Sequence, residues 1–276
     1  MSLRLRNFAG GKNLTKRDGL VSYINDLLEE ATNPHPVELS CIDGRTVQAT
    51  EKPGGPDEAA MILQDGNRRV FSGTVNFDPT VVGAGGMEVG GSTLDTMLFL
   101  YAVPDSVAMK RLTVYGSFND PLIGPELETN YRYLGAVYRN AKGELSRFSQ
   151  SGTEFALHSA AKVEILNDTM MSGRLEPAAI LLPQIPKTAA CAILLAIVES
   201  DNQGGGRVGF YVDGSEYKGE KYFIQSKQAS DQSPLTFEMP IIDPEDPKIW
   251  RRISGFESCG TSKYQLYLNG WCDRYA

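Results

Sequence analysis

The feature that most constrains the fold of this chain is a series of short segments in which apolar and polar residues alternate between glycine-containing turns. Residues 37–41 alternate in this way, Asp43-Gly44 follows, and residues 47–49 resume the alternation. A period of two places apolar side chains on one face of a strand, and Asp-Gly between two such runs is a strong hairpin signal. The sequence therefore predicts an antiparallel hairpin at this position.

The same pattern of short alternating segments and turns continues to the end of the chain. A second hairpin is expected around Asp65-Gly66, and residues 190–198 are apolar at every position, which is typical of a strand covered on both faces. Many short strands at regular spacing are typical of β-sandwiches and jelly rolls. The expected strands cover residues 61–63, 70–77, 96–103, 111–117, 131–139, 144–150, 162–167, 178–182, 189–199, 207–212, 222–225, 235–240 and 263–272.

A helical period is convincing in one place, near the N-terminus. Thr15 is placed to cap a helix, and four residues then share one apolar face: Leu20, Ile24, Leu27 and Leu28. An isolated helix of this length is marginal in water. This face therefore needs a partner, either the rest of the chain or another subunit, and we interpret it as an assembly face.

The predicted fold class is mainly β, with an N-terminal amphipathic helix followed by two antiparallel β-sandwich or jelly-roll-like domains. Residues 1–36 form the arm and helix, residues 37–155 the first β-domain, and residues 156–276 the second β-domain. A chain of 276 residues with 41% hydrophobic residues can bury cores of this size.

Charge and hydropathy argue against two classes of partner. The formal net charge is -7, and the densest basic spots are the isolated pairs Lys16-Arg17, Arg68-Arg69, Lys110-Arg111 and Arg251-Arg252, which we interpret as solvated surface. We expect no nucleic-acid binding.

The longest apolar run spans residues 189–198, too short for a membrane helix of about 20 residues, and the charged start shows no signal peptide. We therefore expect no membrane insertion.

Motifs for catalysis and cofactor binding are not evident. His35 and His158 have no histidine at ligand spacing, no Gly-x-Ser-x-Gly elbow occurs, and Glu88 breaks the dinucleotide pattern that begins at Gly83. We expect no catalytic residues, no cofactor and no metal, and a chain that is not an enzyme. A hydrolase with a carboxylate pair and a calcium site near Asp243 stay open as alternatives.

The chain has four cysteines: Cys41, Cys191, Cys259 and Cys272. Their spacing does not match a zinc knuckle, and four cysteines in a chain this long do not indicate a disulfide framework. We interpret them as buried free thiols, with Cys259–Cys272 the one pair to check as a bridge.

The last expected strand carries the candidate contact residues. Alternation over residues 263–272 places Tyr267 and Trp271 on one face beside Gln265 and Asn269, opposite an apolar face that begins at Tyr264. Exposed aromatic and amide side chains suit a sugar ring or a neighbouring subunit. We expect this face to be a glycan or subunit contact.

Three segments resemble known proteins. Residues 131–152, YRYLGAVYRNAKGELSRFSQSG, after the strand TMLFLYAV at residues 96–103, resemble a hairpin of tailed-bacteriophage fibre, spike and other virion-appendage proteins. The start, with Leu3, Arg4, Asn7 and Leu14-Thr15 before the helix, is similar to N-terminal segments of such proteins. Together the resemblance covers residues 3–28 and 94–155.

The resemblance implies a virion structural protein, either a head or tail fibre or spike, or its adaptor. It implies self-association, most often as a homotrimer or another symmetric oligomer, contact with other virion proteins, and assembly in the host cytoplasm into the virion. Attachment to a host-surface polysaccharide is compatible with it. A glycan-binding β-sandwich module and a capsid coat or decoration protein are the alternatives.

Overall fold

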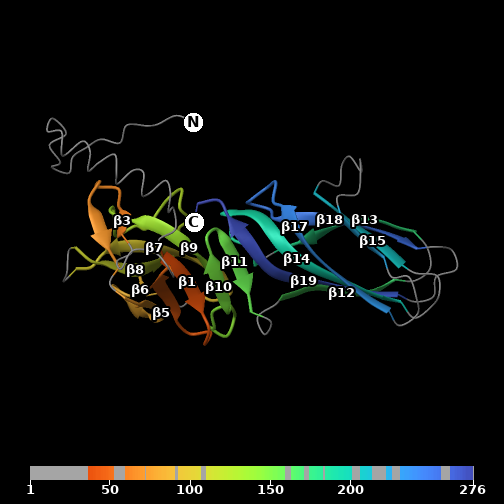
Figure 1. Ribbon diagram of the computed structural model, residues 1–276, viewed down its shortest axis with the longest axis horizontal. Coiled ribbons are helices and arrows are strands. Elements are labelled where there is room, and N and C mark those ends of the chain that lie inside the picture. Colours follow the sequence, from red (N-terminus) through yellow and green to blue (C-terminus); the bar gives the residue numbers. More distant parts are fainter. Residues whose placement is uncertain are drawn as a thin grey trace. The chain divides into compact units, whose positions relative to one another are not determined.

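The computed structural model describes residues 37–52, 60–71, 73–90, 93–106, 110–158, 163–170, 174–182, 184–200, 206–212, 222–225, 231–255 and 262–275. Within these ranges every helix or strand element is a β-strand, so the chain is mainly β, as predicted (Figure 1). The predicted helix with Leu20, Ile24, Leu27 and Leu28 lies outside the described residues. No described helix is long and apolar enough to span a membrane.

The chain divides into two compact units, with the division after Thr153. The sequence places the boundary two residues later, and Tyr275 returns to the first unit. Strands of the first unit are β1 (Val37–Cys41), β2 (Val47–Glu51), β3 (Ala60–Ile62), β4 (Arg68–Val70), β5 (Val75–Val82), β6 (Gly86–Met87), β7 (Thr96–Pro104), β8 (Leu112–Ser117), β9 (Arg132–Arg139) and β10 (Phe148–Ser151).

Within the first unit the strands pair in the order β10-β1-β2-β5-β6-β8-β7-β9, and β3 pairs with β4 alone. The pairs are antiparallel except for β5 with β6 and β6 with β8. The predicted hairpin is confirmed, because Leu39 of β1 lies opposite Ala49 of β2. The Asp43 carboxylate accepts hydrogen bonds from the N–H groups of Arg45 and Thr46, at 2.8 and 2.9 Å, and so fixes the turn.

The predicted second hairpin is wrong in its extent. Met61 of β3 does lie opposite Arg69 of β4, but β4 ends at Val70. Gly73 then adopts a φ of 66°, a left-handed conformation that a strand cannot contain, so the extended segment expected over residues 70–77 is interrupted. Residues from Val75 onward form β5, which pairs with β2 instead.

The core of the first unit centres on β7. All residues from Leu98 to Val103 are buried, so both faces of this strand are covered. The ring of Tyr101 meets the ring of Tyr131 edge-on at 5.4 Å, and its hydroxyl donates a 2.7 Å hydrogen bond to the carbonyl of Asn119. A buried tyrosine is stable here because its polar end has this partner.

The second unit contains two sheets. One has the order β17-β14-β19-β11, with β12 also paired to β19, and the other has the order β13-β18-β15-β16. The strands are β11 (Glu154–Leu157), β12 (Val163–Met170), β13 (Arg174–Leu181), β14 (Ala189–Ser200), β15 (Gly206–Tyr211), β16 (Tyr222–Gln225), β17 (Asp231–Pro240), β18 (Lys248–Gly255) and β19 (Ser262–Asp273).

Side chains from the two sheets of the second unit meet. Phe210 of β15 stacks on Phe237 of β17 with ring centroids 5.1 Å apart, and Tyr222 of β16 contacts the same ring at 4.9 Å. The guanidinium of Arg251, in β18, lies 5.2 Å from the ring centroid of Tyr264, in β19. These aromatic contacts tie the four-stranded sheet to the sheet built around β14.

The prediction that residues 190–198 are covered on both faces is wrong. β14 is a strand, but its burial alternates: Ala192, Leu194 and Val198 are buried, whereas Ile193 and Leu195 are only half-buried. The face of β14 that carries Ile193 and Leu195 is therefore partly open to solvent. In the first unit, by contrast, β7 has both faces covered, because every residue from Leu98 to Val103 is buried.

An irregularity in β19 changes which of its side chains point to the buried face near the C-terminal end of the strand. Ile193 of β14 lies opposite Gly270, and the next residue, Leu194, lies opposite Leu268, so Asn269 is an extra residue in β19. Such a bulge shifts all later side chains to the other face. Leu268 is buried before the bulge and Trp271 is buried after it, so the buried side chains change from even-numbered to odd-numbered positions.

β17 ends the strand order of its sheet. Its ten residues contain Pro234 and Pro240, which lie opposite Ile197 and Cys191 of β14. Proline has no backbone N–H and within sheets is confined mainly to edge strands, strand starts and bulges. The sequence of β17 is therefore suited to its position at an edge.

Candidate functional site

The predicted contact face on β19 is only partly assembled. Gln265, Tyr267 and Asn269 are half-buried, but Trp271 is 1% exposed and stacks on Phe155 with ring centroids 5.4 Å apart and ring planes 7° apart. The prediction that Trp271 shares an exposed face with Tyr267 is wrong, because the bulge at Asn269 lies between them. Trp271 is a core residue of the second unit.

Tyr267 retains a surface position. Its hydroxyl donates a 3.3 Å hydrogen bond to the Glu164 carboxylate of β12, the residue opposite it in the ladder. Desolvation, followed by the negative charge of Glu164, raises the pKa of Tyr267 above its ordinary value. The tyrosine is therefore a neutral hydroxyl and an aromatic face at neutral pH.

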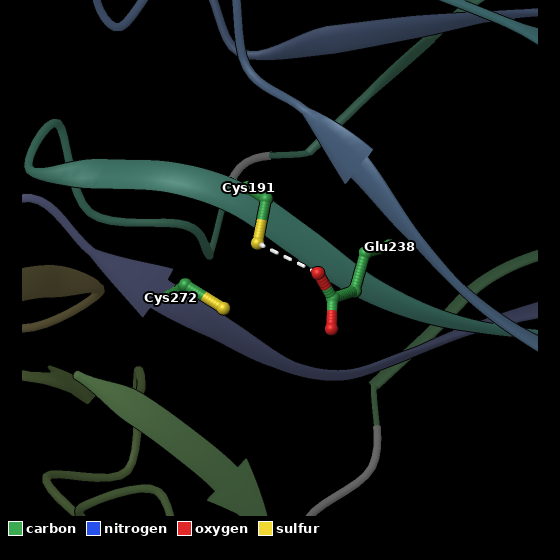
Figure 2. A group of neighbouring side chains, drawn as sticks. All are labelled: Cys191, Glu238 and Cys272. Carbon is green, nitrogen blue, oxygen red and sulfur yellow. Dashed lines mark hydrogen bonds between the residues drawn. The ribbon is translucent and has the colours of Figure 1, made fainter. Parts of the chain in front are cut away.

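A second group of side chains, not predicted from the sequence, lies on the same sheet. Figure 2 shows Cys191 of β14, Cys272 of β19 and Glu238 of β17 pointing toward one another. The Cys191 thiol donates a 4.0 Å hydrogen bond to Oε2 of Glu238, and one ligand atom from each residue lies within 4.8 Å of the others. We call these three residues the thiol–carboxylate cluster.

Strand register explains why the cluster forms. Cys191 lies directly opposite Cys272, and Glu238 lies opposite Ile193, two residues along β14 from Cys191. Residues opposite one another in an antiparallel pair share a face, and residues two apart along a strand share it too. The cluster therefore occupies the half-buried face of β14.

The environment of the cluster keeps the Cys272 thiol protonated at neutral pH. Burial, followed by the Cys191 thiol and the charges of Glu238 and Glu154, raises the pKa of Cys272 to about 12. Both cysteines are nevertheless half-buried rather than enclosed, and Glu238 is exposed. Reagents and ions in solution therefore have access to all three residues.

The structure does not test the Cys259–Cys272 pair, which the sequence singles out as the one bridge to check. Cys259 lies outside the described residues, and the cysteine opposite Cys272 is Cys191. Cys41 is buried in the first unit, where desolvation raises its pKa to about 11. The sequence offered no signal for the Cys191–Cys272 pair, because their proximity depends on the register of two strands far apart along the chain.

An open groove lies beside the cluster and shares Glu238 with it. Its volume is about 440 Å³, and it runs along the edge strand β17. Tyr222 of β16 and Glu154 of β11 contribute an aromatic ring and a second carboxylate to the walls. The full lining is Glu154, Ile193, Tyr222, Leu235, Thr236, Phe237 and Glu238.

The first unit displays a different surface feature, the loop between β8 and β9. Three of its apolar side chains are exposed: Leu122 by 79%, Ile123 by 69% and Leu127 by 66%. We call residues 118–130 the apolar loop. Large apolar side chains at this degree of exposure are unfavourable in water unless a partner covers them.

Hydrogen bonds hold the apolar loop in place. The Asp120 carboxylate accepts the N–H of Leu122 at 2.9 Å, and the Asp120 carbonyl accepts the N–H of Gly124 at 2.8 Å. The buried Glu88 carboxylate accepts the N–H of Leu127. Gly124 has a φ of 78°, and a β-carbon there would lie 2.1 Å from the Tyr131 hydroxyl oxygen, so the loop packs tightly on that ring.

Comparison with known proteins gives no family. No family model and no curated protein matches the chain. Among solved structures, a glycoside hydrolase family 43 arabinoxylan arabinofuranohydrolase from Bacillus subtilis is 12% identical, with 86% of this chain and 53% of that chain covered and a TM-score of 0.28. An exo-β-1,3-galactanase from Phanerochaete chrysosporium is 8% identical, with 83% and 55% covered and a TM-score of 0.23.

A third similarity is to the structure of infectious bursal disease virus, Gx strain, at 10% identity and a TM-score of 0.20, with 92% of this chain and 82% of that chain covered. The chain spans about half the length of the two carbohydrate-active proteins that it matches. TM-scores this low do not support an inference about fold or function.

Proposed function

We propose that this chain is a virion structural protein, a head or tail fibre or spike or its adaptor, that acts by symmetric association with copies of itself. The observation that supports the proposal is the apolar loop, which exposes Leu122, Ile123 and Leu127 on a backbone held by hydrogen bonds. An interface core is typically apolar and packed as densely as a protein interior. The exposed side chains of the apolar loop are apolar, as an interface core requires.

The energetics favour association through a loop of this kind. Burying one Leu or Ile side chain contributes about 1.5–3 kcal/mol. Ordering a mobile loop at the interface would offset much of this gain, but the apolar loop is already fixed by Asp120 and Glu88. The apolar side chains are therefore presented in advance to a second copy of the chain.

The architecture that we propose for this role is a pair of β-sandwich or jelly-roll-like domains. In the second unit, the contacts of Phe237 with Phe210 and Tyr222 support a sandwich, since they join side chains from its two sheets. Rigid layered domains suit a particle component because their outer faces are fixed relative to their cores.

The test is the mass of the full chain in solution, measured by light scattering and sedimentation velocity over a range of concentrations. A discrete symmetric oligomer is expected. Leu122→Asp combined with Ile123→Asp should shift it to monomer, whereas Ile42→Asp, at a position 65% exposed in the β1–β2 turn, should leave the oligomer intact. A monomeric unmodified chain at high concentration would contradict the proposal.

A glycan-binding module is the second candidate, and it fits attachment to a host-surface polysaccharide. Tyr267 and Gln265 share a sheet face with Thr236 of the groove, and Tyr222 and Glu154 line that groove. Aromatic rings can cover a sugar face while carboxylates and amides accept its hydroxyl protons. This combination supports a saccharide ligand.

A glycan array probed with the full chain tests the second candidate. Binding of one saccharide class is expected, with loss of signal in Tyr267→Ala and in Glu154→Gln. Tyr275→Ala, which removes a half-exposed tyrosine of the first unit, is the matched control and should bind normally. An array without signal for the unmodified chain would remove this candidate.

A further inference from the structure

The thiol–carboxylate cluster contains the donor set of a metal site. Two sulfur ligands and one carboxylate oxygen come from three neighbouring strands, β14, β19 and β17 (Figure 2). Within the residues that the structure describes, this is the one place where three His, Cys, Asp or Glu side chains bring ligand atoms together. The cluster is built on sheet positions whose backbones are fixed by pairing on both sides of β14.

The distances fit a tetrahedral ion. Zinc–sulfur bonds of about 2.3 Å and zinc–oxygen bonds of about 2.1 Å place neighbouring ligand atoms about 3.6–3.8 Å apart in a tetrahedron. Sγ of Cys191 lies 4.0 Å from Oε2 of Glu238, and all three ligand atoms fall within 4.8 Å of one another. Small side-chain rotations, without movement of the strands, would close this triangle around one ion.

The chemistry of the ligands selects the class of metal. Thiolates are soft donors that favour zinc-like ions, whereas calcium and magnesium prefer shells made of oxygen atoms. Three protein ligands leave a fourth position for water, as in zinc sites that react with a substrate. Glu238 also lines the groove, so an ion held by it would lie at the edge of that groove.

We propose that Cys191, Cys272 and Glu238 bind one Zn²⁺ ion per chain, with a fourth coordination position accessible to solvent beside the groove. Glu154 lies opposite Cys272 on the other edge of β19 and lines the same groove. Its carboxylate adds negative charge next to the ion without belonging to the three-residue cluster. The site is independent of the apolar loop, which lies in the other unit.

The test is a Zn²⁺ titration of the reduced, metal-free full chain against a chromophoric chelator, with Co²⁺ as a spectroscopic substitute. One Zn²⁺ per chain is expected, together with the sulfur-to-cobalt absorption and the visible bands of a tetrahedral Co²⁺ complex. Cys191→Ser, Cys272→Ser and Glu238→Gln should each weaken Zn²⁺ binding by at least roughly tenfold. Zn²⁺ should also raise the Tm of the unmodified chain.

Two controls isolate the site. Cys41→Ala removes a thiol in the first unit, and Glu245→Gln removes an exposed carboxylate. Neither substitution should change the affinity for Zn²⁺. Glu238 is exposed, so Glu238→Gln keeps the test valid if a cysteine variant fails to fold. Unchanged stoichiometry in the Cys191→Ser, Cys272→Ser double variant would overturn the proposal. So would a Cys191–Cys272 disulfide whose reduction yields no Zn²⁺ binding.

Discussion

The Asp65 carboxylate, in the turn between β3 and β4, accepts hydrogen bonds from three different side chains. It accepts hydrogen bonds from the Arg69 guanidinium at 2.9 and 2.6 Å, from the Asn67 amide at 2.9 Å and from the Asn130 amide at 2.7 Å. Burial acts to raise the pKa of Asp65, but these donors outweigh it and hold the pKa well below its ordinary value. The charged form is therefore favoured in the folded chain.

We expect Asp65→Asn to lower the free energy of unfolding by about 1.5–3 kcal/mol at neutral pH, because it removes hydrogen bonds to a charged group. The folded pKa is lower than the unfolded value of about 3.9, so the stabilisation is complete above that pH and is lost as the pH falls toward the folded pKa. Urea denaturation of both proteins from neutral to acid pH should show the difference shrinking.

The control for Asp65 is an exposed ion pair. Asp246→Asn removes the 2.5 Å contact with Lys248. The side chain of Asp246 is 49% exposed and that of Lys248 is 36% exposed. We expect a much smaller change in the free energy of unfolding than for Asp65→Asn, because water screens such pairs. An equal loss of stability in the two variants would argue against the special role of Asp65.

Trp271 provides a second test at the scale of single residues. Trp271→Ala should lower the free energy of unfolding by about 3–5 kcal/mol, because it removes a buried ring stacked on Phe155. Tyr267→Ala, at a half-buried position four residues away, should cost much less. Chemical denaturation measures both, and a small effect for Trp271→Ala would contradict its assignment to the core.

At the scale of elements, the bulge of β19 determines which side chains reach the core. Deleting Asn269 would make the alternation continuous and turn Trp271 toward the outer face. We expect this deletion to reduce stability by about 3 kcal/mol or more. Asn269→Ala keeps the extra residue and should be nearly neutral, since the buried Asn269 Oδ1 has no hydrogen-bond partner among the described residues.

Thermal unfolding followed by circular dichroism compares the two changes at Asn269. A folded deletion variant with an unchanged Tm would show that the register of β19 adapts to the loss. In that case the face occupied by Trp271 would not depend on the bulge. The Asn269→Ala variant reports separately on the side chain.

Strands with a clean period of two could be predicted, and those with irregular patterns could not. β1 and β2 alternate strictly around an Asp-Gly turn, so the pattern alone indicates their pairing. β18 could not be predicted because arginine stands in place of an apolar residue within it, and Arg251 packs on the Tyr264 ring. The bulge could not be predicted because one inserted residue leaves no compositional signal.

The cysteine cluster could not be predicted for a related reason. Cys191 and Cys272 become neighbours through the pairing of β14 with β19, and Glu238 through the pairing of β14 with β17. Each register is set by turns and by burial over the whole second unit. Local spacing, which reveals zinc knuckles, contains no information about such a site.

At the scale of the whole molecule, charge determines which partners can approach. The chain has 27 Lys and Arg residues against 34 Asp and Glu residues. The basic pairs are not simply solvated surface as expected, because Arg69 is buried against Asp65 and Arg251 lies over Tyr264. Fewer cations are therefore available to a phosphate backbone than the composition suggests.

We expect no measurable binding of double-stranded DNA or heparin at physiological salt, because a net charge of -7 repels polyanions. Mobility-shift assays and elution from a heparin column measure this directly. Retention on heparin above physiological salt would contradict the expectation. Such retention would point to a basic patch that the strand positions do not reveal.

Pro234 and Pro240 restrict how copies of this chain can join. Open-ended fibrils grow when an exposed strand accepts another strand through unbroken backbone pairing. At the β17 edge, two of the ten positions lack an N–H, and the exposed Glu238 adds a charge between them. Backbone-templated polymerisation is therefore disfavoured at this edge, and copies of the chain that associate would have to do so through side-chain surfaces instead.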